Sequence, residues 1–409
     1  MKKSVNVDRR RCWAALILIG VLLVNGLITA PIAQAAPAGL TTIASCALDK
    51  AITAANQGST AGTGCTFSGT GQPYVFILSA NLSLSTELPA ITSKLIITTD
   101  GNNVVIDQTS ADASFVFNVG QTGNLTLKAI RVTNTGGNSD GIDVDTGGLF
   151  AMVDSTLDSL IFGISSSGTV TVNNSTISNS ALGFWIAGGS ATMVNSTVVG
   201  NLGDGIYIDQ GANLTISDST LANNGGSGLD VDGAVVVVST IIAQNTSFGC
   251  LVRIGQITSH GYNIESPGNT CNLGATGDRA RIPPLGTGGL NLDPILAQNG
   301  PQPRPHTRAL LSGSVAIDAI PTTSGLCPPN GVSVDERGNV RAGQVRAGDQ
   351  RGGLACDVGA YEFDSTEILS ATTLRDFGAQ AQPSATGLWP ATLLLALSGT
   401  WLVARHRRA

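Results

Sequence analysis

The residues most suited to chemistry in this sequence stand at fixed distances after a recurring glycine. That glycine occurs at Gly141, Gly163, Gly183, Gly205 and Gly228. Two residues after it stand Asp143, Ser165, Trp185, Tyr207 and Asp230. Four residues after it, at three of the five repeats, stand Asp145, Asp209 and Asp232. Equal offsets from one repeated glycine predict two outward columns of side chains on stacked coils.

Asp209 and Asp232 are expected on adjacent coils, where their backbones would lie about 4.8 Å apart. Two such carboxylates repel each other, so one pKa rises unless a cation joins them. Hard oxygen ligands suit Ca²⁺, which makes this pair a candidate metal site and calcium the one cofactor that the sequence suggests. Glycoside hydrolysis also needs paired carboxylates, so Asp209 and Asp232 are the catalytic candidates if the protein is an enzyme. The alternative is a solvated polar face.

Trp185 and Tyr207 are expected to be outward neighbours, with Asp143 and Asp230 in the same column. Exposed aromatic rings beside carboxylates could stack on sugar rings. These four side chains therefore form the predicted ligand-binding set. The alternative is that the two rings pack under a loop or close an edge.

The coil region is strongly acidic. From Val132 to Val252 the sequence has no Lys and no Arg, and it contains ten aspartates. A polysaccharide lyase needs a base and a group that neutralises the substrate carboxylate. Only Arg131 and Arg253, at the two borders, could serve, so lyase chemistry is disfavoured.

Columns of this kind require a repeated coil, and a second series of residues supplies the period. A Ser-Thr-apolar triplet begins at Ser155, Ser175, Ser196, Ser219 and Ser239, with spacings of 20, 21, 23 and 20 residues. Two alternating apolar stretches per period predict an all-β, right-handed, single-stranded parallel β-helix with coils of about 20–23 residues. Stacked Asn and Ser side chains are expected to form ladders along the axis. A leucine-rich repeat is disfavoured because its Leu/Asn consensus is missing.

The open ends of such a stack need covers. A short helix over Ala44–Asn56, capped by Thr42, is expected to cover the first coil, with Leu48, Ala51, Ile52 and Ala55 on its buried face. The irregular segment 282–363 is expected to cover the last coil.

Charge and cysteine content narrow the class of protein. The formal net charge is −6, and it becomes more negative once the basic first segment is excluded. A nucleic-acid partner is therefore excluded, since phosphate binding needs a basic face. Apart from Cys12, six cysteines form three local pairs, and pairing of nearest neighbours is the favoured one of about 15 arrangements. These pairs are Cys46 with Cys65, Cys250 with Cys271, and Cys327 with Cys356.

The two ends of the chain predict export and anchoring. Residues 1–35 have a basic start, an apolar run from Trp13 to Val24 and the small-residue pattern Ala33-Gln34-Ala35, which is typical of a signal peptide. An uncleaved membrane helix is the alternative. Residues 365–387 form a polar tether and 388–404 an apolar segment. The basic tail 405–409 predicts a transmembrane anchor with its end inside the cell.

Three segments resemble known families. The coils over residues 70–280 resemble the pectin-lyase-like right-handed β-helix proteins. Cys46–Ile52 is similar to the Cys-Ser-Leu-Arg-Glu-Ala-Ile segment that opens many bacterial surface β-helix proteins, with Asp-Lys in place of Arg-Glu. The C-terminal region resembles the choice-of-anchor Q family, and it carries Val315 where that family usually has Pro. The matching stretches are Asn291–Pro294, Ala309–Asp318, Asp349–Gly352 and Cys356–Glu362.

These observations divide the chain into seven parts. They are a signal peptide (1–35), a cap with the first strands (36–90), the β-helix (91–281), the choice-of-anchor Q-like region (282–364), the tether, the anchor and the tail. The resemblance implies a protein on the outer face of a bacterial cell, with extracellular polysaccharide or cell-surface components as partners. The expected function is structural, adhesive or glycan-binding. A carbohydrate-active enzyme, either lyase or glycoside hydrolase, is the alternative.

Overall fold

The computed structural model describes residues 40–101, 103–300, 304–327, 331–341 and 355–363. The predicted signal peptide, tether, anchor and basic tail lie outside these ranges, as does the Asp349–Gly352 stretch. Among the described residues, no helix has the length and apolar character needed to span a membrane.

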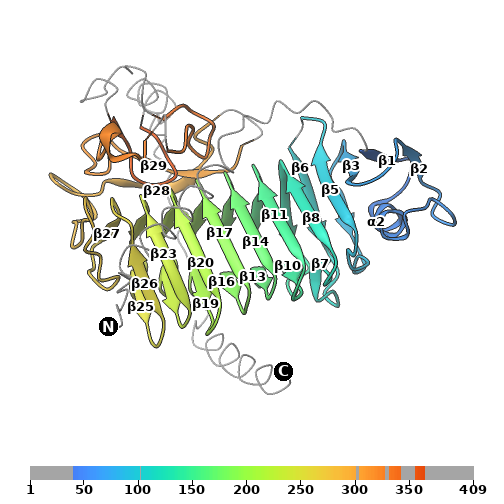
Figure 1. Ribbon diagram of the computed structural model, residues 1–409, viewed down its shortest axis with the longest axis horizontal. Coiled ribbons are helices and arrows are strands. Elements are labelled where there is room, and N and C mark those ends of the chain that lie inside the picture. The colour runs from blue at the N-terminus through green and yellow to red at the C-terminus, as the bar shows by residue number, and fades with distance from the viewer. Residues whose placement is uncertain (1–39, 102, 301–303, 328–330, 342–354, 364–409) are drawn as a thin grey trace, which may run out of the picture. The chain divides into compact units, whose positions relative to one another are not determined.

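Three long sheets run along the molecule (Figure 1). From residue 115 onward each coil contributes one strand to each sheet, whereas the earlier strands belong to two of the sheets alone. Sheet A has the order β2 (Thr66–Ser68), β1 (Thr41–Ala44), β3 (Tyr74–Leu78), β5 (Lys94–Thr99), β8 (Asn124–Lys128), β11 (Leu149–Val153), β14 (Thr169–Asn173), β17 (Ser190–Val194), β20 (Asn213–Ser217), β23 (Ala234–Val238) and β26 (Gln256–Ser259). Sheet B has the order β4 (Leu82–Leu84), β6 (Val104–Gln108), β9 (Ile130–Asn134), β12 (Thr156–Asp158), β15 (Thr176–Ser178), β18 (Thr197–Val199), β21 (Thr220–Ala222), β24 (Ile241–Ala243) and β27 (Ile264–Ser266). Sheet C has the order β7 (Phe115–Val119), β10 (Asp140–Val144), β13 (Phe162–Ser166), β16 (Leu182–Ile186), β19 (Ile206–Ile208), β22 (Leu229–Val231) and β25 (Cys250–Val252).

Apart from the antiparallel pair β1–β2, neighbouring strands in these sheets are parallel and in register. Inward residues of successive coils stack directly on one another, as Val172, Met193 and Ile216 do in sheet A. All three are completely buried, because no coil can shield its own inner face from water. The predicted parallel β-helix is therefore confirmed.

Polar ladders inside the coils satisfy backbone groups that the strands leave unpaired. The Oγ atoms of Ser175, Ser196 and Ser219 each accept a hydrogen bond from the backbone N–H of the serine one coil earlier, at 3.1–3.2 Å. At another corner the side-chain carbonyl oxygen of Asn224 accepts two hydrogen bonds from Asn201. The backbone N–H donates one at 3.2 Å and the side-chain amide donates the other at 2.9 Å. These ladders confirm the prediction of stacked Ser and Asn side chains.

The recurring glycine makes room for one of these ladders. A Cβ atom at Gly183 would lie 2.4 Å from the carbonyl oxygen of Gly205 and 2.9 Å from Asn201 Nδ2. A side chain at this position would therefore push adjacent coils apart. The glycine series marks a point at which adjacent coils leave no room for a side chain.

Helix α2 (Leu48–Gln57) lies at the N-terminal end of the stack (Figure 1). Leu48, Ala51, Ile52 and Ala55 are buried, as predicted. The predicted cap by Thr42 is wrong. Thr42 lies in β1, which extends sheet A by pairing with β3, and the N-cap residue is Ala47.

All three cysteine pairings follow the nearest-neighbour prediction. Cys46 is bonded to Cys65, Cys250 to Cys271, and Cys327 to Cys356. Disulfides form and persist in oxidising compartments, so the three bonds agree with a protein that works outside the cytosol.

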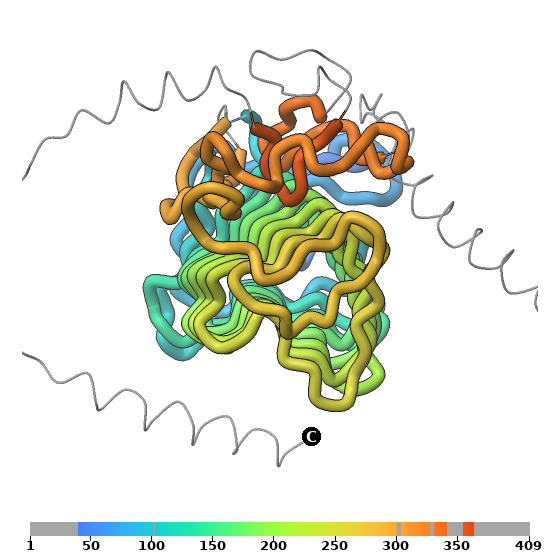
Figure 2. Tube along the Cα trace, turned by 90° about the vertical axis from the view of Figure 1, so that its left-hand side faces the viewer, coloured from blue at the N-terminus to red at the C-terminus, as the bar shows by residue number. Residues whose placement is uncertain are grey.

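The C-terminal segment takes a different path from the one expected. It contains β28 (Leu292–Ala297), β29 (Thr307–Leu310), β30 (Ile320–Pro321), the 3₁₀ turn Thr322–Ser324 and β31 (Ala355–Cys356). Its described residues lie along the side of the coils and do not only close their end (orange in Figures 1 and 2). Residues 268–281 follow the last complete coil, where the backbone N–H of Glu265 bonds the carbonyl of Arg279 at 2.8 Å.

Side chains of sheet B hold this C-terminal segment. The hydroxyls of Thr176 and Thr197 lie 2.9 and 2.5 Å from the two carboxylate oxygens of Glu336. Arg341 donates a hydrogen bond to the side-chain oxygen of Asn195 at 2.9 Å. The N–H of Ala360 donates to Thr220 Oγ1 at 3.2 Å. The segment is thus bonded to successive coils through polar groups.

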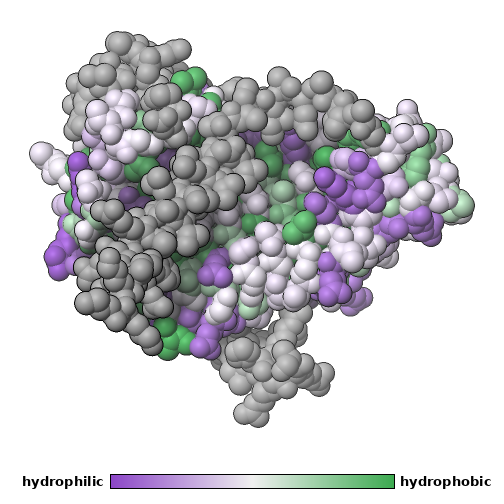
Figure 3. Space-filling model, in the orientation of Figure 1, coloured by the Kyte–Doolittle hydropathy of each residue, from purple (hydrophilic) through white to green (hydrophobic). Residues whose placement is uncertain are grey.

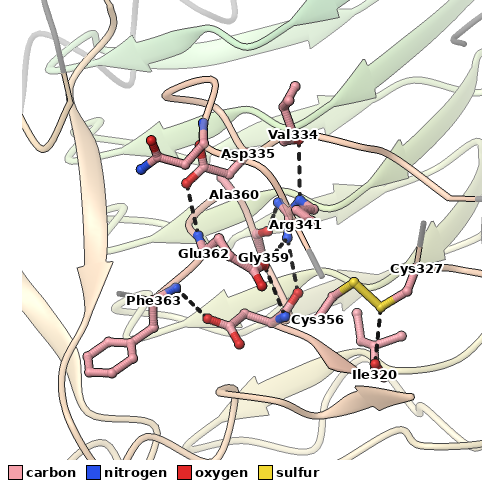
Figure 4. A network of polar contacts seen from close by, with 12 residues as sticks. Ile320, Cys327, Val334, Asp335, Arg341, Cys356, Gly359, Ala360, Glu362 and Phe363 are labelled. Atoms are coloured by element: carbon pink, nitrogen blue, oxygen red, sulfur yellow. Dashed lines mark hydrogen bonds and ion pairs between the residues drawn. A yellow bond between two sulfur atoms is a disulfide. The ribbon is translucent and has the colours of Figure 1, made fainter. Parts of the chain in front are cut away.

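The segment is itself built around buried charges (Figure 4). Arg337 and Asp335 form an ion pair at 2.7 Å in which both side chains are fully buried. The Arg337 guanidinium also lies 3.6 Å from the centre of the Tyr361 ring. Arg341 lies 3.3 Å from Glu362 and donates to the carbonyl of Gly359. Buried charges of this kind persist only when each has a partner, so removing one partner is costly.

Burial raises the pKa of the Glu336 carboxyl well above its usual range. Burial likewise raises the pKa of Asp218 to about 6, against the attraction of Arg341. Asp218 sits at the corner between sheets A and B with a φ of 49°, in series with Asn174 and Asn195, which have φ values of 49° and 48°. Asn tolerates this left-handed conformation well.

We expect Asp218→Asn to stabilise the protein at pH 8 and to have little effect at pH 4. When folding raises the pKa of an acid, the folded protein loses stability as the pH rises. The loss begins near the pKa of the acid in the unfolded chain, about 4, and continues through its pKa in the folded protein, about 6. The variant lacks this loss, so its free energy of unfolding at pH 8 should rise by about 1–3 kcal/mol. Melting curves at several pH values measure this, with the exposed Asp112→Asn as the control. A variant that is equally stabilised at both pH values would contradict the assignment.

Candidate functional site

The outer face of sheet C brings three of the predicted binding residues together. Trp185 on β16 is the register partner of Tyr207 on β19, and Tyr207 is the partner of Asp230 on β22. Their neighbours along the strands, such as Phe184 and Ile206, are completely buried. Alternation along each strand therefore points the three polar or aromatic side chains outward. We call this row, together with Asp232 and Arg253, the sheet C site.

The fourth predicted binding residue lies apart from the others. Asp143 on β10 pairs with Ser165 on β13, and Ser165 pairs with Trp185. Two coil spacings of about 4.8 Å thus separate Asp143 from Trp185. Asn118, one coil earlier, donates a hydrogen bond to the Asp143 carboxylate at 3.3 Å. Asp143 shares the predicted column and lies beyond direct reach of the two rings.

Trp185 is partly exposed and is held by a second ring. The centres of Phe162 and Trp185 lie 5.6 Å apart with an interplanar angle of 63°, an edge-to-face arrangement that aromatic pairs favour. Within the described part of the chain, the buried Trp185 Nε1 has no hydrogen-bond partner. An indole N–H is a donor only, so it would require an acceptor from a ligand or water.

Tyr207 connects the aromatic row to the carboxylates. Its hydroxyl lies 3.2 Å from Asp232 Oδ2. Burial, followed by the negative charges of Asp209 and Asp232, raises the pKa of Tyr207 to about 12. The phenol therefore keeps its proton at neutral pH and serves as a hydrogen-bond donor.

Asp230 is the most buried member of the site, at 3% exposed. Burial raises the pKa of Asp230 to about 6. The positive charge of Arg253 lowers this pKa, and the negative charges of Asp204 and Asp232 raise it further. Arg253 Nη2 lies 2.7 Å from Asp230 Oδ2, and Nη1 of the same guanidinium lies 3.9 Å from Asp232 Oδ2. The other oxygen of each aspartate, Oδ1, is buried and has no hydrogen-bond partner among the described residues.

Asp209 and Asp232 do stand on adjacent coils, and they have different surroundings. Their backbones take equivalent places, since the N–H of Asp209 bonds the carbonyl of Ile186 and the N–H of Asp232 that of Ile208. Asp209 accepts the N–H of Gln210 at 2.9 Å, whereas Asp232 faces Tyr207 and Arg253. No group of three or more His, Cys, Asp and Glu side chains among the described residues is arranged to hold a metal. Calcium at this pair stays a prediction, with two protein carboxylates as its ligands.

A shallow hollow of about 480 Å³ adjoins the site at the turns between sheets C and A. Asp232 lines it together with Gly211, Asn213, Gly233, Ile254 and Gln256. The Ile254 side chain is 68% exposed, so the hollow has one apolar wall. Asp232 thus belongs both to the row on sheet C and to an open depression beside it.

Arg253 is the functional candidate that the sequence placed only at the border of the repeats. Gly249 continues the glycine series, because the next residue, Cys250, pairs with Leu229. Arg253 stands four residues after Gly249 and therefore follows Asp209 and Asp232 in their column. Extending the glycine series by one coil would have assigned it to the site.

We expect Arg253→Gln to destabilise the protein at pH 8 and to have a smaller effect at pH 4. Its loss leaves the buried Asp230 charge without a counter-charge above pH 6, whereas protonation removes that charge at low pH. A half-exposed ion pair of this kind contributes on the order of 1 kcal/mol. Melting curves of Arg253→Gln, Asp230→Asn and the double variant measure the coupling. An unchanged effect of Arg253→Gln in the Asp230→Asn background would contradict the pairing.

One comparison with known families agrees with this architecture. Residues 159–280 match the family model described as the right handed beta helix region. No curated protein matches the chain. Among solved structures, the enzymatically active domain of bacteriophage CBA120 tailspike protein 2 is similar over 51% of this chain and 41% of that chain, with 12% identity and a TM-score of 0.33. The chain thus spans well under two thirds of that domain. The family match over residues 159–280 and the stacked coils together show that the chain has a right-handed parallel β-helix fold.

Proposed function

We propose that this protein is a cell-surface β-helix protein that binds glycans through the sheet C site. The observation that carries the proposal is the row Trp185, Tyr207 and Asp230 on three successive coils. The two rings are partly exposed, and the row ends at a carboxylate oxygen without a hydrogen-bond partner among the described residues. Aromatic faces beside fixed polar groups suit a sugar, which offers apolar ring faces and hydroxyl groups.

The spacing of the coils supports a chain-like ligand. Trp185 and Tyr207 lie on neighbouring strands, about 4.8 Å apart at the backbone. An extended ligand that runs along the axis could therefore contact several coils in succession. The hollow beside Asp232 would give such a ligand room at the end of the row.

Export and anchoring form the second part of the proposal. Three disulfides support an oxidising environment. The basic and apolar pattern of residues 1–35 supports a signal peptide, and the apolar segment 388–404 with its basic tail supports a membrane anchor. We propose that the described domain stands outside the cell and that the tail stays inside.

A carbohydrate-active enzyme is the second candidate, and one observation favours it. The pKa of Asp230 is raised to about 6 by burial, and the Asp232 carboxylate shares its Arg253 partner. A carboxyl group with a raised pKa next to a second carboxylate is what acid and base catalysis of glycoside hydrolysis requires. The pair favoured by the structure is therefore Asp230 with Asp232, in place of Asp209 with Asp232.

We expect the purified full-length protein to bind at least one member of a panel of soluble plant and microbial polysaccharides. Trp185→Ala should weaken that binding about tenfold, which corresponds to about 1.4 kcal/mol. Phe248→Ala, which removes a ring that is 44% exposed outside the site, should leave the affinity unchanged. Calorimetry, with and without Ca²⁺, measures the affinities of the parent protein and of the two variants. Equal affinities of the parent and Trp185→Ala would overturn the assignment of the site.

The same incubations separate binding from catalysis. A glycan-binding protein releases no new reducing or unsaturated ends. Release that is lost in both Asp230→Asn and Asp232→Asn would make the protein a glycoside hydrolase or lyase and would overturn the binding-only reading.

We expect a chain that ends at Gly387 to appear in the medium of expressing cells, whereas the full chain stays with the membrane fraction. The apolar segment 388–404 would be the part that holds the protein. Deletion of residues 365–387 removes a similar length and keeps this segment, so it serves as the control and should leave the protein in the membrane. Fractionation and immunoblotting measure the outcome, and retention of the shortened chain would refute the anchor.

A further inference from the structure

The sheet C site has an excess of negative charge. Burial and the charges of Asp209, Asp232 and Asp230 act on Tyr207, and the charge of Asp204 acts on Asp230. Arg253 is the one cation that acts on Asp230 in this group. The two aspartates of the site, the neighbouring Asp204 and Asp209, and Arg253 leave a formal charge of −3 (−4 + 1) when all are ionised. A ligand that carries positive charge would offset this excess.

The unfilled hydrogen-bonding positions of the site have a definite chemistry. Asp230 Oδ1 and Asp232 Oδ1 are buried acceptors without a donor among the described residues. Trp185 Nε1 is a buried donor without an acceptor there. Leaving such buried groups unpaired is unfavourable. A ligand that satisfies all three offers N–H or O–H donors toward the aspartates and an acceptor toward the indole. The negative charge around the two aspartates favours a cationic N–H donor, such as an ammonium group.

The aromatic row favours the same charge. An ammonium group above the face of Trp or Tyr is attracted by the ring, and the attraction grows where water is excluded. Trp185 and Tyr207 are both only partly exposed and lead directly to Asp230. A uronate, by contrast, would meet four aspartates, and the guanidinium of Arg253 already lies 2.7 Å from Asp230.

We infer that the sheet C site takes a glycan of amino sugars with free ammonium groups. This inference rests on the proposed glycan-binding function and names its ligand class. The ammonium groups bond Asp230 Oδ1 and Asp232 Oδ1, and a ring hydroxyl accepts the Trp185 indole N–H. The rings of Trp185 and Tyr207 pack against the sugar faces.

The test compares three oligosaccharides of equal length on the full-length protein by calorimetry. They are oligomers of glucosamine, of N-acetylglucosamine and of galacturonic acid. We expect the glucosamine oligomer to bind at least tenfold more tightly than its N-acetylated counterpart and the galacturonic acid oligomer to bind most weakly. Added salt should weaken the preference, because it screens charge interactions.

Variants assign the preference to particular groups. Asp232→Asn should abolish the preference for glucosamine and leave binding of the N-acetylated oligomer in place. Trp185→Ala should weaken binding of both. Asp145→Asn serves as the matched control, because this exposed aspartate stands in the same column on a distant coil, and it should change neither affinity. Circular dichroism confirms that each variant is folded.

The outcomes separate this inference from the proposed function. Equal affinities for the acetylated and free forms would overturn the amino-sugar class while glycan binding still stands. Tightest binding of the galacturonic acid oligomer would do the same. If the protein bound none of the three oligomers and no polysaccharide of the wider panel, both the amino-sugar inference and the proposed glycan binding would be overturned.

Discussion

The spacing of stacked backbones, about 4.8 Å, is the constraint on which the rest of this structure depends. Each strand inside the stack takes its hydrogen bonds from the coil before and the coil after. The serine ladder through Ser175, Ser196 and Ser219 and the ladder through Asn201 and Asn224 complete this bonding at the corners. Because each ladder side chain accepts a hydrogen bond from the coil before it, a shift by one residue would disturb both the ladder and the inward row. The period must therefore be kept wherever coils meet.

This constraint explains why so much of the site could be predicted from the sequence. Once coils stack in register, a constant offset from the recurring glycine places side chains in one column. Trp185, Tyr207 and Asp230 are register partners for that reason. The Cys250–Cys271 disulfide follows from the same regularity, because a cysteine about one coil away along the chain is close in space. Arg253 was not assigned to the site because the glycine series ended at Gly228, one coil before Gly249.

The parts that could not be predicted lack a period. Thr42 reads as a helix cap because Leu48 and Ile52 recur with helical spacing, yet β1 and the turn at Ser45 intervene before α2 begins. The course of the C-terminal segment depends on single contacts between residues far apart in sequence. Glu336 reaches Thr176 across 160 residues, and Arg341 reaches Asn195 across 146. No local pattern encodes such contacts. The part of the described surface that is visible in the orientation of Figure 1 mixes white, purple and green residues (Figure 3).

The C-terminal segment also constrains the number of coils that lie beside it. Its polar groups bond Asp154, Thr176, Thr197, Thr220 and Ser239, which belong to five successive coils. An extra coil inserted between two of these residues would carry half of the bonds out of reach by about 4.8 Å. Among the described residues, these bonds do not extend to the coils that precede Asp154. During evolution, repeats could therefore be gained or lost on the N-terminal side, while the stretch that holds the sheet C site keeps a fixed length.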